Sequence, residues 1–149
     1  MFPTLKYPNA PLRIKKSEND KFLVFDEIRG KWLVLTPEEW VRQHYVYYLT
    51  NVLGYSKGLI SLEKEIVLNN TSKRYDIVVF DIKRNPEVIV ECKAPHIKLD
   101  NITLEQILRY NLVLSVPFLV ITNGMEDIVL QNNKIIKQLP KKNPTAKSD

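Results

Sequence analysis

Three residues near the middle of the chain have the types and spacing of a hydrolytic metal site. Residues 88–95 read VIVECKAP, an apolar run that ends with Glu91 and Lys93. Side chains alternate between the two faces of a strand, so these two charges point the same way and Cys92 points the other way. Burying a carboxylate and an ammonium group is costly unless each finds partners. The two charges therefore require partners elsewhere in the chain.

Asp76 supplies a second carboxylate. If the segments on either side of the loop DIKRN pair as a hairpin, Asp76 falls opposite Glu91, and opposed side chains on one face lie about 5 Å apart. Two facing carboxylates repel, and a divalent cation relieves that repulsion. Mg²⁺ takes one or two carboxylates, waters and phosphate oxygens, and the backbone carbonyl of Cys92 is a further oxygen ligand. Lys93 would then orient a water or stabilise charge on a phosphate.

The chain around these residues alternates helical and strand patterns. TPEEWVRQHYVYYLTNVLGY starts with Thr36 as a cap, Pro37 in the first turn and Glu39 completing a capping box, and it ends at Gly54. A second helical pattern covers residues 100–115. Strands are predicted at 21–25, 31–35, 61–68, 74–80, 86–93 and 117–124, with a final hairpin turning at Asn132–Asn133. This order predicts an α/β fold with a central mixed sheet flanked by helices and an N-terminal β-hairpin.

Length and composition describe one ordinary domain. The 149 residues suffice for a single core, and we expect an extended arm over 1–20, the domain over 21–139 and a disordered basic tail over 140–149. The lone Cys92 excludes an internal disulfide, and no apolar run approaches the roughly 20 residues of a membrane span. We therefore expect a cytoplasmic protein without membrane contacts. The net charge of +5 weakly favours a polyanionic partner.

The spacing Asp–x₁₄–Glu–Cys–Lys resembles the PD-(D/E)xK nuclease superfamily. More closely, the chain resembles the N-terminal nuclease domain of the motor (R) subunit of type I restriction enzymes. The stretches that carry the likeness are TPEEWVRQ (36–43), RYDIVVFD (74–81), VIVECKAP (88–95), EQILRYN (105–111) and ITNG (121–124). The resemblance implies a restriction-endonuclease-like αβββαβ core, Mg²⁺ as the cofactor with Mn²⁺ able to replace it, and DNA as the substrate.

The resemblance also implies roles for residues of the two helices. Glu38 matches the helical glutamate that precedes the Asp and Glu-x-Lys motifs, and Gln106 and Tyr110 match a Gln-x-x-x-Tyr motif. Positions i and i+4 share a helix face, so both would reach the metal site or the DNA. The chain departs from the pattern in two places. Tyr75 replaces a proline, and no Gly-x-x-x-x-Gly-Lys-Ser/Thr loop occurs, so the helicase is missing and we expect a stand-alone version or a fragment.

Several of these residues have a structural alternative. Acidic residues such as Glu38 favour a helix's first turn through its dipole, Gln106 fits a capping box with Thr103, and Tyr110 suits a core position. The other predictions divide into two groups. Lys73, Arg74 and His96 are predicted to contact phosphate or substrate, with loop solvation as the alternative for His96. His44 is predicted to pack and Cys92 to be a core residue. Glu63 and Glu65 share one strand face and are predicted to be exposed charges, with the alternative that one of them reaches the site. The remaining predicted solvated charges are Lys15, Lys16, Lys141 and Lys142.

Together these features favour a metal-dependent endonuclease that hydrolyses DNA phosphodiester bonds. Asp76 and Glu91 would bind Mg²⁺, Lys93 would activate water, and Glu38 and Gln106 would assist. The alternative is a catalytically silent DNA-binding or assembly module with the same fold. A two-carboxylate glycosidase is disfavoured by the nearby lysine. One active site cuts one strand, so double-strand cleavage would require a homodimer or two visits, and recognition would depend on a DNA-recognition or motor partner.

Overall fold

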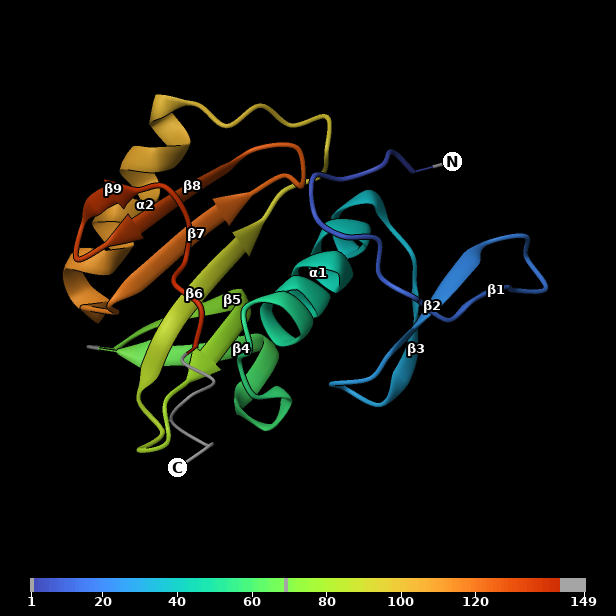
Figure 1. Ribbon diagram of the computed structural model, residues 1–149, viewed down its shortest axis with the longest axis horizontal. Coiled ribbons are helices and arrows are strands. Elements are labelled where there is room, and N and C mark those ends of the chain that lie inside the picture. The colour runs from blue at the N-terminus through green and yellow to red at the C-terminus, as the bar shows by residue number, and fades with distance from the viewer. Residues whose placement is uncertain (1, 69, 143–149) are drawn as a thin grey trace.

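Two β-sheets and two α-helices make up the part of the chain that the computed structural model describes, residues 2–68 and 70–142 (Figure 1). The small antiparallel sheet has the order β1-β2-β3, and the large sheet has the order β4-β5-β6-β7-β8-β9. The strands are β1 (Ile14–Lys16), β2 (Phe22–Asp26), β3 (Lys31–Val34), β4 (Ile60–Leu68), β5 (Thr71–Phe80), β6 (Pro86–Cys92), β7 (Phe118–Thr122), β8 (Asp127–Gln131) and β9 (Lys134–Ile136). The helices are α1 (Pro37–Tyr47), the π-helical turn η1 (Tyr48–Val52), the short η2 (Lys57–Leu59) and α2 (Asn101–Leu114).

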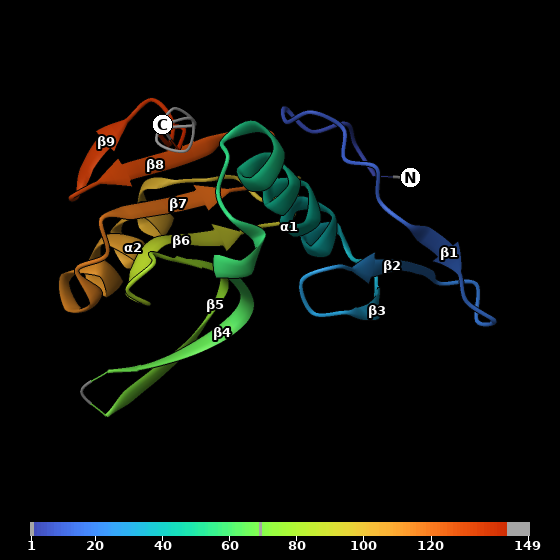
Figure 2. The ribbon, with the colours of Figure 1, turned by 60° about the horizontal axis from the view of Figure 1, so that its bottom comes forward.

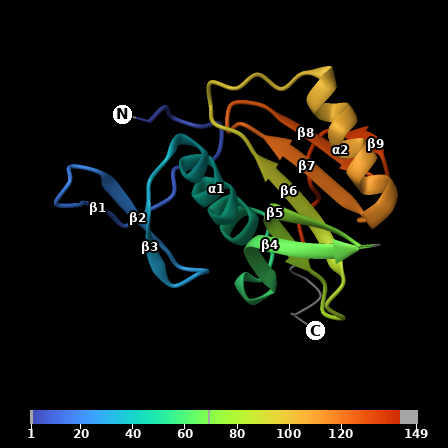
Figure 3. The same ribbon diagram turned by 180° about the vertical axis from the view of Figure 1, so that it is seen from behind.

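The two helices cover opposite faces of the large sheet (Figures 2 and 3). Successive residues of a strand point to opposite faces, and the two core clusters divide accordingly. One cluster joins α1 and η1 to β5 and β6 through Val41, Tyr45, Leu49, Ile77, Val79, Val88 and Val90. The other joins α2 to the same strands and β7 through Ile107, Val78, Ile89, Leu119 and Ile121. Burial on both faces explains why β5 and β6 read as continuous apolar runs.

One strand pairing in the large sheet is parallel. β6 and β7 run in the same direction, while the other neighbouring strands are antiparallel. A parallel pair needs a long crossover, and α2 provides it. The carboxyl ends of β6 and β7 therefore meet at the same edge of the sheet. This edge carries the residues that follow VIVEC.

The predicted fold class is confirmed. The elements α1, β4, β5, β6, α2 and β7 occur in the order αβββαβ around a mixed sheet, and β2 and β3 form the predicted N-terminal hairpin. The final hairpin also turns at Asn132 and Asn133, both with positive φ. The sequence analysis missed β1, which adds a third strand to the hairpin.

Three local predictions were wrong in detail. β5 begins at Thr71, three residues before the predicted start of this strand at residue 74. Thr36 caps α1 by accepting a hydrogen bond from the backbone N–H of Glu39 at 3.0 Å, but the Glu39 carboxylate binds arginines instead of closing a capping box. Asp100 caps α2, accepting from the N–H of Thr103 at 2.9 Å. Thr103 is therefore not the N-cap of α2, and Gln106 does not form a capping box with it.

Both ends of the described chain pack on the large sheet. Leu5, Tyr7 and Ala10 of the predicted arm are buried, and the Tyr7 hydroxyl lies 2.7 Å from Thr122 Oγ1. At the other end, Lys142 pairs with Glu87 at 2.6 Å, so this lysine is more than the solvated charge that was predicted. The rest of the predicted disordered tail, residues 143–149, lies outside the described residues. No described helix is long and apolar enough to cross a membrane.

Candidate functional site

Asp76 and Glu91 meet where β5 and β6 approach the edge of the sheet. The register pairs Ile77 with Val90, so the next residue of each strand brings Asp76 beside Glu91, as the hairpin prediction required. The backbone N–H of Cys92 donates to Asp76 Oδ2 at 2.8 Å. One residue on, the backbone N–H of Lys93 donates to the carbonyl of Thr122 at 2.8 Å. The two strands and β7 thus hold the backbone of the Glu-Cys-Lys segment.

Glu91 lacks full compensation for its charge. Its carboxylate accepts one hydrogen bond from Lys73 Nζ at 3.3 Å. Burial and, to a smaller extent, the neighbouring Asp76 raise the pKa of Glu91 to about 7, against the opposing effects of Lys73 and Lys93. A group with this pKa sheds its proton readily when a cation approaches. Lys73, predicted to contact phosphate, is instead paired with this carboxylate.

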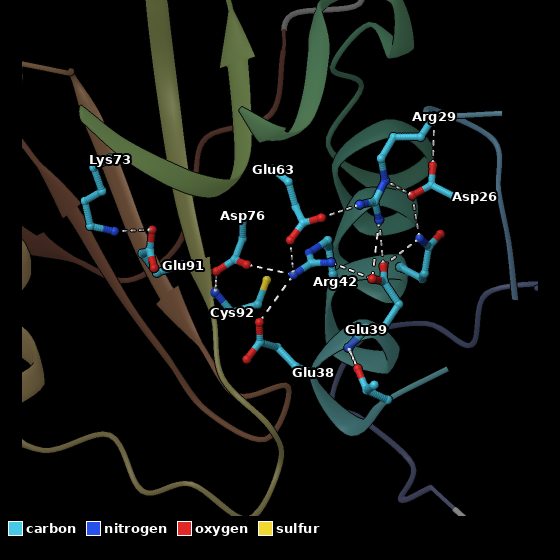
Figure 4. Close-up of polar contacts among 12 residues, drawn as sticks. Asp26, Arg29, Glu38, Glu39, Arg42, Glu63, Lys73, Asp76, Glu91 and Cys92 are labelled. Carbon is cyan, nitrogen blue, oxygen red and sulfur yellow. Dashed lines mark hydrogen bonds and ion pairs between the residues drawn. The ribbon is translucent and has the colours of Figure 1, made fainter. Parts of the chain in front are cut away.

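Asp76 is compensated by an arginine from α1 (Figure 4). Arg42 Nη2 lies 2.8 Å from Asp76 Oδ1 and 3.3 Å from Glu38 Oε1, and Arg42 Nη1 lies 2.5 Å from Glu39 Oε1. Burial would lower the pKa of the guanidinium, but Glu39 and Asp76 together raise it. Arg42 therefore stays charged and places a positive charge beside the Asp76 carboxylate.

A second arginine extends this network to the small sheet. Arg29, in the turn between β2 and β3, donates from Nε to Asp26 Oδ2 at 2.7 Å and from Nη2 to Glu39 Oε2 at 3.1 Å. Gln43 Nε2 bridges the same two carboxylates at 3.0 and 2.9 Å. Asp26 and Glu39 are buried, and buried carboxylates are stable only when paired in this way. The small sheet is thus tied to α1 by ion pairs that lead on to Asp76.

Glu63 joins the network from β4. It is exposed, as predicted, and it is the glutamate of this strand face that reaches the candidate site, a possibility that the sequence left open. Its carboxylate lies 2.8 Å from Arg29 Nη1 and 3.9 Å from Arg42 Nη2. Its backbone has a φ of +51°, and the flanking pairs Leu62–Ile77 and Lys64–Tyr75 place it across from Asp76. A positive φ costs a non-glycine residue about 1–2 kcal/mol. This local break in the strand directs Glu63 to the two arginines.

A surface groove runs along this cluster. Its volume is about 560 Å³, and it is lined by Glu38, Arg42 and Glu63 from the network together with Val34, Ala94 and His96. Burial raises the pKa of Glu38, and Asp76 raises it further, against Arg42 and Lys93. The positive charge of Lys93 lowers the pKa of both Glu38 and Glu91, so it acts on both carboxylates. The groove gives solvent access to the network on its α1 and β4 side, at Glu38, Arg42 and Glu63.

The other predicted site residues have different outcomes. Gln106 is exposed on α2, and none of its described interactions links it to Asp76 or Glu91; the side chain of Tyr110 lies outside the described part of the chain. Arg74 and His96 are exposed, and only His96 lines the groove. Cys92 is buried in the core on the α1 side, as predicted. His44 packs against Trp40, also as predicted.

The sequence analysis missed four polar residues of the network: Asp26, Arg29, Arg42 and Gln43. A signal for Arg42 and Gln43 was present, because both follow Glu38 and Glu39 at helical spacing and share their face. No comparable signal exists for Asp26 or Arg29, since they come from the end of β2 and the turn after it, which are remote in sequence from Asp76 and Glu91. The positive φ of Glu63 could not be predicted either, because a glutamate does not indicate this backbone conformation.

The oxygen atoms at the strand ends fit a Mg²⁺ ion. The Asp76 and Glu91 carboxylates and the Cys92 carbonyl are hard ligands of the kind that Mg²⁺ takes. The raised pKa of Glu91 indicates that neighbouring cations do not fully balance a negative charge at this position. Within the described ranges, no three His, Cys, Asp or Glu side chains form a ready-made metal cluster. Waters and phosphate oxygens would have to complete the coordination, as is usual for this ion.

Comparisons with known proteins identify relatives of this chain. The family model described as "Type I restriction enzyme R protein N terminus" matches residues 37–141, which include α1, the large sheet and α2. Among solved structures, the chain is similar to a candidate nuclease of the DUF820 group from Anabaena variabilis. That match has 14% identity and a TM-score of 0.44, and covers 78% of this chain and 79% of the other. None of the curated proteins matches.

Proposed function

Because the chain belongs to the family of type I restriction enzyme R protein N-terminal domains, we propose that it is a metal-dependent endonuclease acting on DNA. Asp76, Glu91 and Lys93 form the proposed catalytic centre. The observation that carries the proposal is the position of Glu91: a largely buried carboxylate with a pKa near 7, placed beside a second carboxylate at a strand end. Such perturbed carboxylates are typical of functional sites.

Three groups would hold the metal ion: the Asp76 and Glu91 carboxylates and the carbonyl of Cys92. A bound Mg²⁺ stabilises charge on the scissile phosphate and lowers the pKa of a ligated water. The hydrogen bond from the Cys92 N–H fixes one oxygen of Asp76, so the carboxylate has a defined orientation. The strand pairing limits the freedom of all three groups, which favours catalysis by positioning.

Lys93 is proposed to orient the attacking water and to stabilise the negative charge that develops on the phosphate. Its backbone is held by the hydrogen bond to Thr122, and its charge acts on both Glu38 and Glu91. A cation held in place before the reaction costs no reorganisation in the transition state. Mn²⁺ is proposed to replace Mg²⁺.

Arg42 and Glu38 are proposed as positioning residues. Arg42 holds Asp76 from the α1 side at 2.8 Å, and Glu38 holds Arg42 at 3.3 Å. Gln106 and Tyr110, proposed from the Gln-x-x-x-Tyr motif, would reach the DNA backbone instead of the metal. The exposure of Gln106 favours this role for it.

Plasmid cleavage tests the proposal. The purified chain is incubated with supercoiled plasmid and with single-stranded DNA in Mg²⁺, in Mn²⁺ and in EDTA. Lys93→Ala is the test variant, and Lys98→Ala removes an exposed lysine from the same loop as a matched control. We expect cutting only with metal, lost in Lys93→Ala and kept in Lys98→Ala.

Metal binding by calorimetry separates the other outcomes. Absence of cutting together with absence of Mn²⁺ binding would refute the metal site. Absence of cutting with Mn²⁺ bound at Asp76 and Glu91 would favour the silent DNA-binding module instead. Equal loss of cutting in both lysine variants would refute the specific role of Lys93.

A further inference from the structure

The small sheet has an outward face with an unusual composition. In β2 and β3 the register pairs Phe25 with Trp32 and Leu23 with Val34, and Lys15 of β1 lies opposite Leu23. Paired residues point to the same side of a sheet. We name this side the aromatic-basic face, and its members are Arg13, Lys15, Leu23, Phe25, Trp32 and Val34. Its opposite side carries the fully buried Val24 and Asp26, so the aromatic-basic face is the outer one.

Cations lie directly over the rings of this face. The guanidinium carbon of Arg13 is 4.4 Å from the centroid of Phe25, and Lys15 Nζ is 4.1 Å from the centroid of Trp32. The two rings meet edge to face, with centroids 5.4 Å apart. Arg13 and Lys15 are exposed. Lys15 is thus more than the ordinary solvated charge that the sequence suggested.

These cations differ from those of the candidate site. Arg29 and Arg42 each bind several carboxylates, whereas Arg13 and Lys15 have no carboxylate partner among the described residues and contact only rings. The six residues of the face include two positive charges and no negative charge. An anion approaching this face therefore meets two uncompensated cations.

The aromatic-basic face adjoins the groove of the candidate site. Val34 belongs to this face, follows Trp32 by two residues, and is 48% exposed. It also lines the groove beside Glu38 and Arg42. The small sheet lies on the far side of α1 from the large sheet (Figures 1 and 3). A polymer leaving the groove past Val34 would cross Trp32 and Phe25 next.

We propose that the aromatic-basic face binds a single strand of DNA, with bases stacked on Trp32 and Phe25 and phosphates bound by Arg13 and Lys15. Single-strand binding sites combine a basic track with aromatic rings in this way. A base stacks on a ring more strongly than an exposed cation does, so an arriving base displaces the lysine or arginine toward the phosphate. An acidic peptide would use the cations but not the rings. The choice of DNA rests on the proposed function.

Binding is measured in the Lys93→Ala protein in EDTA, so that no cleavage occurs during the measurement. A loss of DNA binding can then be distinguished from a loss of nuclease activity. Fluorescence anisotropy of labelled (dT)₁₂ gives the Kd. We expect Trp32→Ala to weaken binding about tenfold, while Trp32→Phe, which keeps a ring, stays within about threefold of the parent. Circular dichroism of each variant checks folding, and Trp32→Phe and the charge variants keep the test decisive if Trp32→Ala does not fold.

A charge-matched pair separates this face from general electrostatics. Arg13→Gln/Lys15→Gln removes two charges from the face, and Lys83→Gln/Arg84→Gln removes two exposed charges from the β5–β6 turn. We expect a loss at least fivefold greater for the first pair, following the local phosphate contacts. Equal losses for the two pairs would overturn the proposal. So would tighter binding of a 12-base-pair duplex, of oligo(rU) or of an acidic peptide than of (dT)₁₂.

Discussion

The two carboxylates of the candidate site differ in their partners although they are neighbours. The Asp76 carboxylate accepts from Arg42 and from the Cys92 N–H, whereas the Glu91 carboxylate has, among the described residues, the single longer contact with Lys73. Charge compensation is therefore uneven, and the pKa of Glu91 rises to about 7. In the absence of metal, ionisation of Glu91 opposes folding.

Glu91→Gln is expected to stabilise the metal-free protein at pH 8. The pKa of Glu91 is raised from about 4.5 to about 7 in the folded state, so the folded state binds the proton more tightly and stability falls as pH rises between these values. Removing the charge should recover on the order of 2 kcal/mol at pH 8 and little at pH 4. Urea unfolding in EDTA measures this, with the exposed Glu65→Gln as the control. A less stable Glu91→Gln at pH 8 would contradict the assignment.

Arg42→Ala is expected to lower the free energy of unfolding by about 3–5 kcal/mol, because it leaves buried carboxylates without their cation. Glu39 is buried and Asp76 is nearly so, and Arg42 contacts both. Arg109→Ala, at an exposed position of α2, should stay within about 0.5 kcal/mol of wild type. Chemical denaturation of both variants is the measurement. Similar, small effects of the two substitutions would show that the ion-pair network contributes little to the free energy of unfolding.

At the scale of elements, α1 determines where the network residues lie. Its start is set by Thr36, which accepts from the Glu39 N–H, and the first turn then carries Glu38 and Glu39 toward Arg42 four and three residues on. A shift of this turn would move both carboxylates. The cap therefore affects the site as well as the stability of the helix.

Thr36→Ala is expected to lower the free energy of unfolding by about 1 kcal/mol and also to reduce metal-dependent plasmid nicking. Asp100→Ala is the matched variant, since it removes the N-cap of α2, which is remote from Arg42. It should destabilise the fold but leave nicking unchanged at a temperature where both proteins are folded. If both variants lose nicking equally, the first turn of α1 has no special link to the site.

At the scale of the whole molecule, the N-terminal segment packs into the core between α1 and the large sheet. Tyr7 packs in the core cluster with Tyr45 and Leu49, and its hydroxyl bonds to Thr122 and Asp127. Burial raises the pKa of the Tyr7 hydroxyl, so it stays protonated and donates to Asp127. The backbone N–H of Lys6 adds a bond to the carbonyl of Gly124 at 2.9 Å.

Tyr7→Phe is expected to destabilise the protein by about 1 kcal/mol, the value of a hydrogen bond whose partners remain satisfied. Thr122 Oγ1 still donates to Asp127 Oδ1, at 2.6 Å, which limits the loss. Tyr47→Phe serves as the control, because the Tyr47 hydroxyl has no described hydrogen bond. Urea midpoints that do not differ between the two variants would show that the segment is not anchored by Tyr7.

The order of elements and the core of the site were predictable from the sequence. Apolar runs, the Thr36 cap and the turn residues predict α1, the three strands and α2, because these signals are local. The separation of Asp76 from Glu91 predicts their proximity once a hairpin is assumed, since strand pairing maps sequence distance onto space. The register of β5 and β6 agrees with that expectation.

The set of charges that share a network depends on how the elements pack. Arg29 reaches Glu39 and Glu63 because the small sheet packs beside α1, and Glu63 turns inward through a backbone angle that residue type does not encode. The fold class and the pairing of Asp76 with Glu91 could be predicted without the structure, since both follow from periodicity and spacing. Long-range packing decided the partners of each carboxylate, because ion pairs between remote segments depend on distances that no local pattern carries.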